Sequence, residues 1–269
     1  RKNLKKGLII VFWGYFLKLA LADNLDIYVH ANYENLIGSN TSSLIVSIIF
    51  YSFQIYGDFF GYSLIAIGIA KILGFHFPAN FNLPYFSKSF QDFWRRWHIS
   101  LSSFLRDYLY INLGGSRKGK IRTYFNLMTT MTLGGIWHGA SYNFIFWGIM
   151  HGSLLSIERF FRNLKFKIPK IFSILIVFLI VSILWIPFRL PDIDSIKIVF
   201  ESLINLNDFS FYQIRSKFIF IKCLFILITV LLADLLVSKR IFVKILKKDI
   251  LTGSVLGIIF FLILLLGNF

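Results

Sequence analysis

Long apolar stretches separated by short polar segments make up most of the chain. The stretches are Gly7–Ala22, Leu44–Phe75, Tyr124–Ile157, Ile171–Phe188, Phe218–Val237 and Gly253–Leu266. A helix that crosses a bilayer needs about 20 mainly apolar residues. The first stretch is short and is interrupted by Lys18, the second is long enough for more than one helical element, and the last is marginal in length. The pattern as a whole predicts an all-α, polytopic integral membrane protein.

The charged segments between the apolar stretches predict a topology. Arg159–Lys170 and Ser238–Lys248 are basic, whereas Arg189–Lys217 also carries acidic residues. Because cytoplasmic loops are enriched in Lys and Arg, we expect the first two segments in the cytoplasm and the third outside. The basic segment Arg117–Arg122 would also be cytoplasmic, so both ends of Tyr124–Ile157 would lie on the same side. We expect that stretch to cross twice through short helices, or to enter the membrane and return.

The segment Lys88–Tyr110 differs from the apolar stretches because its hydrophobic positions recur with a helical period. On a helix of about 3.6 residues per turn, one arc carries Phe90, Phe93, Trp94, Trp97, Leu101, Phe104, Leu105 and Tyr108. The arginines of the segment fall off this arc. An amphipathic helix of this kind lies in the plane of the membrane interface. The pattern therefore predicts one interfacial helix over the segment.

Composition agrees with a membrane protein and excludes several other classes. The chain has 269 residues, of which 57% are hydrophobic and 16% charged, against about 45–50% and about 25% in soluble domains. A soluble enzyme, a disordered chain and a disulfide scaffold are excluded as first interpretations, and Cys223 is the single cysteine.

The net charge is +16. Because the basic residues lie between apolar stretches, we expect them to contact membrane lipid headgroups and not nucleic acid. No linker or repeat divides the sequence, so we expect residues 1–269 to form a single domain.

His138 is the strongest candidate for chemistry. It lies in an apolar stretch, and Gly134, Gly135 and Gly139 surround it in the sequence. Ionisable groups inside membranes are costly and mark functional sites, and glycine permits irregular backbone and the close approach of a ligand. A neutral imidazole is also a suitable general base near neutral pH. The alternative role is a histidine that only hydrogen-bonds a neighbouring helix.

Other ionisable residues have less support from the pattern. For His98 the pattern favours an interfacial histidine at the wet edge of the amphipathic helix, and for His151 a packing or hydrogen-bonding role beside Gly152. Asp58 is a candidate for a buried carboxylate that pairs with a basic residue of another helix or carries protons. The sequence has no metal-binding motif and no P-loop spacing. We therefore expect neither a metal ion nor a bound cofactor.

Several ordered motifs resemble the membrane-bound O-acyltransferases, in particular the bacterial branch of alginate and peptidoglycan O-acetyltransferases. The motifs are Tyr56–Ser63 (YGDFFGYS), Phe93–Ser102 (FWRRWHISLS), Arg106–Ile111 (RDYLYI), Leu113–Gly115 (LGG) and Leu133–Ser141 (LGGIWHGAS). The chain departs from the branch at Leu64 and Asn112. The resemblance implies a helical membrane bundle with re-entrant or short helices. Because family members are longer, it also implies that this chain is the C-terminal part of a longer protein.

The resemblance implies a role for each matching residue. His138 is the expected catalytic residue, and His98 is the second family histidine. The residues expected to contact substrate are Trp137, Arg95, Arg106, Asp107 and Asp58. Family members take an acyl group from a cytoplasmic thioester, acetyl-CoA or another, and deliver it to an acceptor outside the cell membrane. The resemblance therefore implies O-acetylation of an exported polysaccharide at the bacterial inner membrane, with an extracytoplasmic acetyltransferase protein as partner.

Two alternative functions stay open at this point. One is D-alanyl transfer to teichoic acid, which belongs to the same superfamily. The other is a polytopic transporter or flippase that makes no covalent bond, because broken helices and charges at the membrane midplane are also typical of transporters. The contexts Trp94–His98 (WRRWH) and Leu113–Gly115 (LGG) favour the O-acetyltransferase over D-alanyl transfer.

Overall fold

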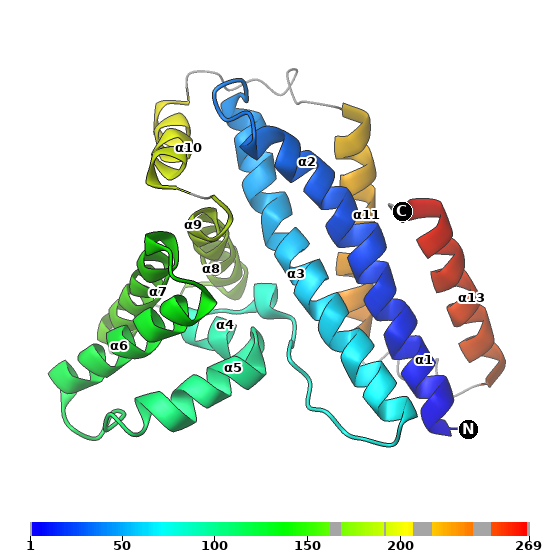
Figure 1. Cartoon of the computed structure of the whole chain (residues 1–269), viewed down its shortest axis with the longest axis horizontal. Coiled ribbons are helices and arrows are strands. Elements are labelled where there is room, and N and C mark those ends of the chain that lie inside the picture. The colour runs from blue at the N-terminus through cyan, green and yellow to red at the C-terminus, as the bar shows by residue number, and fades with distance from the viewer. Residues whose placement is uncertain (1, 162–167, 191, 207–216, 239–248, 268–269) are drawn as a thin grey trace. The chain divides into compact units, whose positions relative to one another are not determined.

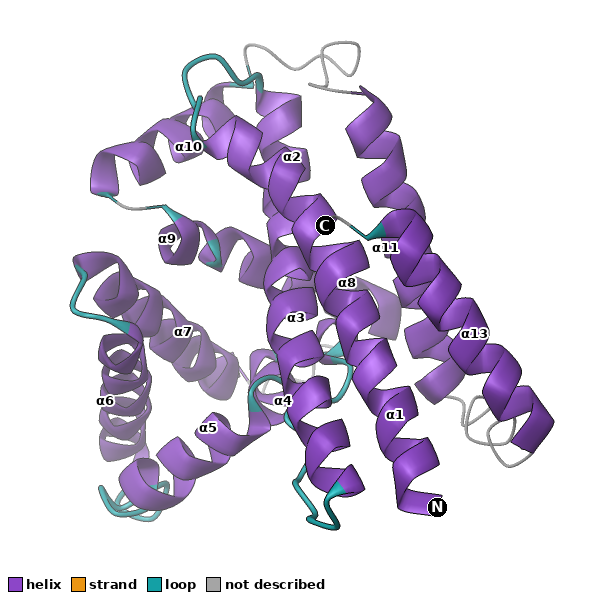
Figure 2. Cartoon of the chain, turned by 45° about the vertical axis from the view of Figure 1, so that its right-hand side comes forward, coloured by secondary structure: helices purple, strands orange, loops and turns teal. Residues whose placement is uncertain are grey.

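A computed structural model describes residues 2–161, 168–190, 192–206, 217–238 and 249–267. All regular structure in these ranges is helical, as Figure 2 shows, so the predicted all-α class is confirmed. The chain forms two compact units, one of Arg1–Ala79 with Ser202–Phe269 and the other of Asn80–Glu201. The expectation that residues 1–269 are a single domain stays a prediction.

The first unit is built on two long helical segments that run side by side (Figure 1). The first segment passes without a break from α1 (Lys2–Tyr15) through the π-helical η1 (Phe16–Ala22) into α2 (Asp23–Tyr33). The second is α3 (Thr41–Ile72), a single helix of 32 residues where the sequence had allowed more than one element. Both segments are long and apolar enough to span a membrane, as is Lys170–Arg189 in the second unit.

Glycines allow α1 and α3 to pack closely. A Cβ atom on Gly14 would lie 2.7 Å from the backbone oxygen of Gly61, and one on Gly7 would lie 2.7 Å from that of Gly68. The two pairs are one heptad apart on both helices, so they mark one line of contact. Small residues at such a line let membrane helices approach until their backbones touch.

Two further helices, α11 (Lys217–Ser238) and α13 (Asp249–Leu266), pack against the first long segment of this unit. The amide of Asn24 donates to the carbonyl oxygen of Leu266 at 2.8 Å, and the thiol of Cys223 donates to the carbonyl oxygen of Asn24 at 3.2 Å. Asn24 therefore links both C-terminal helices to α2. Most of the predicted cytoplasmic loop Ser238–Lys248, and residues 162–167 of the other one, lie outside the described residues. The predicted topology stays a prediction.

The second unit contains the segment that was expected to be one interfacial helix. The structure has instead a 3₁₀ turn, η2 (Pro84–Phe86), followed by α4 (Phe90–Arg96), α5 (Ile99–Phe104) and the π-helical η3 (Leu105–Tyr110). The prediction of one continuous helix over Lys88–Tyr110 is wrong, because the chain turns at His98. The apolar arc is divided accordingly: Phe93 and Trp97 are buried, whereas Tyr108 is exposed.

A hairpin of α6 (Lys120–His138) and α7 (Tyr142–Phe161) follows in the second unit. The helices are joined by a short turn directly after His138, which agrees with the short helices expected over Tyr124–Ile157. Neither helix is among the candidate membrane spans, so crossing or re-entry stays a prediction. Glycines again set the contact, because a Cβ on Gly148 would lie 2.5 Å from the carbonyl oxygen of Met131.

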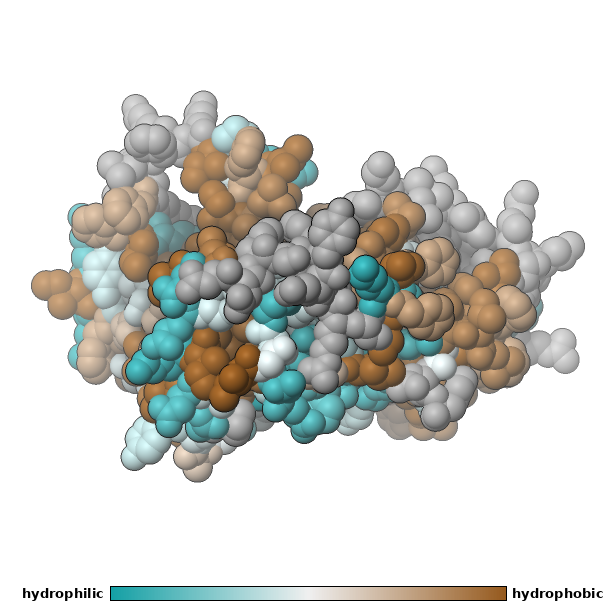
Figure 3. All heavy atoms as spheres, turned by 90° about the horizontal axis from the view of Figure 1, so that it is seen from above, coloured by the Kyte–Doolittle hydropathy of each residue, from teal (hydrophilic) through white to brown (hydrophobic). Residues whose placement is uncertain are grey.

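The hairpin is followed by α8 (Lys170–Leu184), α9 (Ile186–Arg189) and α10 (Ile193–Asn205). The helix α10 lies in a segment that the charge pattern had described only as a mixed loop. Along α8 the side chains of Ile171, Leu175 and Leu179 recur every four residues and are exposed. Figure 3 shows that exposed apolar side chains also gather on other parts of the surface. Contiguous apolar surface of this kind suits contact with lipid, as expected of a membrane protein.

Candidate active site

The break between α4 and α5 places His98 at a sharp turn. His98 has φ 44° and ψ 57°, in the left-handed region that residues with a side chain rarely occupy. Such a residue costs on the order of 1–3 kcal/mol and persists only where its surroundings hold it. The surroundings here are the non-helical residues before η2, because Ile99 N–H donates to the carbonyl oxygen of Asn80 and Asn82 N–H donates to that of Arg96, both at 2.9 Å.

The side chain of Asn80 orients the imidazole of His98. Its oxygen accepts from the backbone N–H and the hydroxyl of Ser100, at 3.2 and 3.0 Å, and lies 3.2 Å from Nδ1 of His98. Because the backbone N–H can only donate, the Asn80 atom at this point must be the acceptor. Nδ1 of His98 therefore donates, and Nε2 carries the lone pair of the neutral ring.

His138 lies at the C-terminal end of α6, where aromatic rings surround it. Its ring centroid is 5.3 Å from that of Trp147 on α7 and 5.1 Å from that of Phe188 on α9, and both rings meet it edge to face. The side chain is half-buried. Among the residues that the structure describes, neither ring nitrogen of His138 has a hydrogen-bond partner. An imidazole in this setting is held by packing, while its nitrogens stay available to a bound molecule.

Trp137 connects the two histidines, which are 40 positions apart in the sequence. Its ring centroid lies 6.4 Å from that of His98 and 5.1 Å from that of His138, and the indole is 64% exposed. Burial first, and then the nearby His138, lowers the pKa of His98 to about 4. Burial likewise lowers the pKa of His138. Both rings are therefore neutral at neutral pH, and each can accept a proton.

His151 lies one helical turn after Trp147 on α7 and is fully buried. Its ring centroid is 4.7 Å from that of Trp147 and 5.0 Å from that of Trp94, and neither ring nitrogen has a partner among the described residues. The packing role expected for His151 is confirmed, whereas the alternative of hydrogen bonding is not found there. The ring of Trp147 contacts the rings of both His138 and His151, so the three side chains pack as one group.

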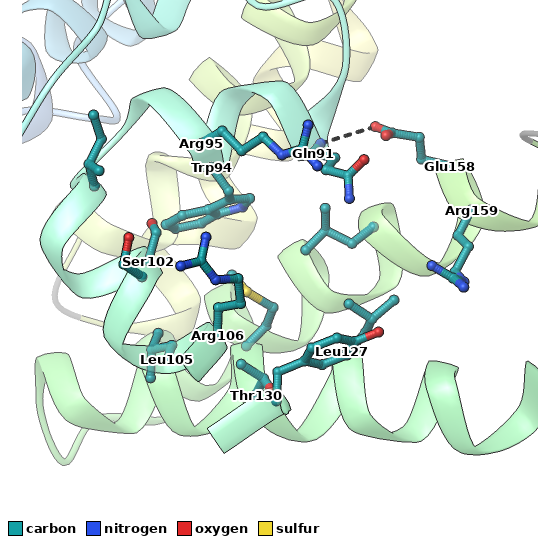
Figure 4. Close-up of a pocket in the computed structure, with 15 residues that line it drawn as sticks. Gln91, Trp94, Arg95, Ser102, Leu105, Arg106, Leu127, Thr130, Glu158 and Arg159 are labelled. Carbon is teal, nitrogen blue, oxygen red and sulfur yellow. Dashed lines mark hydrogen bonds between the residues drawn. The ribbon is translucent and has the colours of Figure 1, made fainter. Parts of the chain in front are cut away.

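Apart from Trp137, the residues expected to contact substrate are Arg95, Arg106 and Asp107 in the second unit and Asp58 in the first. Arg95 and Arg106 line a cavity of about 330 Å³ in the second unit (Figure 4). Trp94 lines the same cavity. Asp107 does not line it. The carboxylate of Asp107 instead accepts two hydrogen bonds from the guanidinium of Arg106, at 2.7 and 2.9 Å, on the exposed surface of η3. This contact lowers the pKa of Asp107.

Asp58 lies in the first unit and is paired. Its carboxylate contacts the ammonium of Lys18 at 2.5 Å, and the same ammonium contacts Asp23 at 2.8 Å. The expected pairing with a basic residue of another helix is therefore confirmed. The expectation of a buried carboxylate is wrong, because the Asp58 side chain is 40% exposed. No cluster of three or more candidate metal ligands occurs in the part of the chain that the structure describes.

Sequence reasoning missed several residues that shape this site. Asn80 lies outside every motif, and only its position before Pro84 could have marked it as part of a turn. Phe188 and Trp147 are ordinary members of apolar stretches. Arg159 was counted among the basic residues of a cytoplasmic loop, yet it lines the same cavity as Arg95.

Comparison with known proteins gives the family. The model of the MBOAT, membrane-bound O-acyltransferase family, matches residues 6–185. The chain is 39% identical over 220 residues to a peptidoglycan O-acetyltransferase of Helicobacter pylori, covering 80% of this chain and 42% of that protein. It is 41% identical over 204 residues to a probable alginate O-acetylase of Azotobacter vinelandii, covering 76% and 41%.

A more distant relative is a teichoic acid D-alanyltransferase of Bacillus subtilis, 31% identical over 176 residues, which cover 61% of this chain and 44% of that protein. The chain thus spans less than half the length of these curated relatives. The family model covers the first long helices, the turn at His98 and the hairpin that carries His138. The chain belongs to the membrane-bound O-acyltransferase family.

Proposed function

We propose that the protein to which this chain belongs is an O-acetyltransferase that moves an acetyl group from a thioester to a hydroxyl group. One observation carries the proposal: His98 and His138 come from separate elements, meet across Trp137, and are both neutral at neutral pH. Acyl transfer to a hydroxyl needs a base of this kind, because the attacking oxygen must lose its proton.

In the proposed step, His138 accepts the proton of the acceptor hydroxyl while the oxygen attacks the thioester carbonyl. The new C–O bond forms, the C–S bond breaks, and the proton passes from the imidazolium to the departing thiolate. A general base contributes typically about 10²–10⁴-fold to such a rate. His98 is the positioning partner, because its Nδ1–H is held by Asn80 and Trp137 lies beside both its ring and that of His138.

The names of the relatives support the choice of acceptor. The two more similar proteins are named for peptidoglycan and for alginate, so we propose an exported polysaccharide as acceptor. We further propose acetyl-CoA or another acyl thioester as the cytoplasmic donor, with transfer across the bacterial inner membrane. An extracytoplasmic acetyltransferase protein would be the immediate acceptor or its neighbour.

The test uses the full-length protein reconstituted in liposomes. It compares transfer of labelled acetyl from acetyl-CoA with transfer of labelled D-alanine from a charged carrier protein. Acetyl transfer to polysaccharide, or to the partner protein, is the expected result. Transfer of D-alanine alone would assign the protein to the teichoic acid reaction instead. Movement of polymer with no covalent transfer from either donor would assign it to transport.

A further inference from the structure

The cavity of the second unit combines positive charge with an apolar wall. Side chains from α4, α5, η3, α6 and α7 line it, and the guanidinium groups of Arg95, Arg106 and Arg159 belong to three different elements. Figure 4 shows Arg106 and Arg159 on opposite sides of the cavity, with Arg95 near its upper edge. Glu158 is the acidic residue of the lining.

The carboxylate of Glu158 is hydrogen-bonded to the backbone of α4. Its carboxylate accepts hydrogen bonds from the backbone N–H groups of Phe90 and Gln91, the second at 3.3 Å, at the start of α4. A carboxylate at this position satisfies N–H groups that have no partner within the helix. Glu158 therefore caps α4, and its single negative charge stands against the three guanidinium groups of the lining.

The three arginines differ in whether an acidic side chain pairs with them. Arg106 is held by Asp107 through two hydrogen bonds. Arg95 and Arg159 form no ion pair with any residue in the described ranges. The cavity thus has an excess of positive charge, and two guanidinium groups in it have donors to offer. Guanidinium groups bind carboxylate and phosphate in a two-pronged geometry, and phosphate groups are negatively charged at neutral pH.

The remaining lining is apolar. Leu127 and Met131 of α6 and Leu155 of α7 form this part, together with the indole of Trp94. A ligand that fills the cavity must therefore have an anionic end for the arginines and a less polar segment for these side chains. A volume of about 330 Å³ lies at the lower end of the range for small-molecule sites, about 300–1,000 Å³.

We propose that this cavity binds the phosphate group of a phosphate-bearing amphiphile, with Arg95 and Arg159 as its principal ligands. Two molecules share this chemistry. One is the phosphorylated carrier arm of the thioester donor, a source that rests on the proposed function. The other is the headgroup of an anionic phospholipid, a source that does not. The cavity adjoins the histidines through Trp94, whose ring centroid is 5.7 Å from that of Trp147, which in turn contacts His138.

The experiment measures binding and not turnover, so it stays informative if the proposed reaction is wrong. The full-length protein in nanodiscs is titrated with coenzyme A and with pantetheine, which has the same arm without the nucleotide and its phosphates. A second arm compares nanodiscs of phosphatidylglycerol with nanodiscs of phosphatidylcholine by native mass spectrometry. The variants are the double substitution Arg95→Gln with Arg159→Gln, and Arg122→Gln as a matched control, since Arg122 is exposed on α6 and does not line the cavity.

The double variant should weaken binding of the phosphate-bearing ligand by at least about tenfold, because it removes two charged donors and hydrogen bonds to charged groups are the strong ones. The Arg122→Gln control and a His138→Ala variant should bind as the wild type does. Loss confined to coenzyme A identifies the donor arm as the ligand, and loss confined to phosphatidylglycerol identifies the lipid. Wild-type affinity of the double variant for both ligands would overturn the proposal. So would a wild type that prefers neither coenzyme A over pantetheine nor phosphatidylglycerol over phosphatidylcholine.

Discussion

The side-chain oxygen of Asn80 lies 3.2 Å from Nδ1 of His98 and fixes which nitrogen of that imidazole carries the proton. The same oxygen accepts from Ser100, and the backbone of Asn80 accepts from Ile99. One residue thus holds both the strained backbone of His98 and its ring. Orientation of this kind is worth as much to a site as the choice of the reactive group itself.

Replacement of Asn80 by Ala should therefore impair acyl transfer without removing a residue that reacts. Loss of the acceptor removes the Asn80 contact to Nδ1 of His98 and leaves Ser100 N–H without this partner, so we expect a decrease in rate of about 10- to 100-fold. The measurement is the initial rate with full-length protein at matched membrane abundance. Asn82→Ala is the control, because the hydrogen bonds recorded for Asn82 are made by its backbone. Equal rates in the two variants would contradict the role of the Asn80 side chain.

The pH dependence of the rate should reflect the lowered pKa values of both histidines. Burial, then the proximity of His138, lowers the pKa of His98 to about 4, and burial lowers the pKa of His138. A lowered pKa keeps the ring neutral to more acidic pH, so the rate should reach half of its maximum only below about pH 6.5. An ordinary histidine would instead give half the rate at about pH 6.5. Rates measured under conditions where the protein stays folded distinguish the two, and half-loss at pH 6.5 would count against the neutral pair.

Stability should depend on pH through His151. Burial lowers its pKa to about 3, against about 6.5 in an unfolded chain. The unfolded state therefore binds the proton more readily, so the contribution is complete above pH 6.5 and is lost as the pH falls towards 3, by at most about 1.4 kcal/mol per pH unit. His151→Phe keeps an aromatic ring and removes the titrating group. The unfolding temperature of this variant should therefore change less between pH 7 and pH 5 than that of the wild type. His76 is exposed, so His76→Phe should leave the pH dependence of the unfolding temperature unchanged. A wild type whose unfolding temperature does not change over this range would contradict the prediction.

Gly135 should be intolerant of any side chain. A Cβ there would clash with the backbone oxygen of Phe144 on α7 and lie 3.2 Å from the Cα of Gly148. Gly135→Ala must push α6 away from α7, and overpacking of this kind costs typically about 1–3 kcal/mol. Gly257→Ala is the control, since its Cβ would meet no atom within 4 Å. Thermal unfolding in detergent checks both, and unchanged stability of Gly135→Ala would show that the hairpin can adjust.

The apolar pattern predicted helices well where lipid-facing and buried positions are both apolar. It located α3, α8, α11 and α13 to within a few residues, because hydrophobic length alone marks such segments. It failed at Lys88–Tyr110, where the helical period continues through a break. The break at His98 depends on hydrogen bonds to Asn80, which is 18 positions away, and no local pattern contains that information.

The candidate site was foreseeable only in part for a similar reason. The glycines around His138 and the motif resemblance pointed to this histidine, and the structure brings His98 near it through Trp137. Nothing in the spacing of Trp147 or Phe188 indicated that their rings would enclose His138, because such contacts join separate helices. The pairing of Asp58 was foreseen without its partner, since Lys18 had been seen only as an interruption in an apolar stretch.

The most direct test of the account is acyl transfer by a full-length protein that carries His138→Ala. Acetylation of the exported polymer is measured in cells with membrane abundance checked by blot, beside His76→Ala as a matched control and His98→Ala as a comparison. The account predicts a loss of about 10²–10⁴-fold for His138→Ala, which is about 3–5 kcal/mol of transition-state stabilisation, and no loss for His76→Ala. Near-normal acetylation by His138→Ala at normal abundance would contradict it, and a severe defect confined to His98→Ala would move the catalytic role to His98.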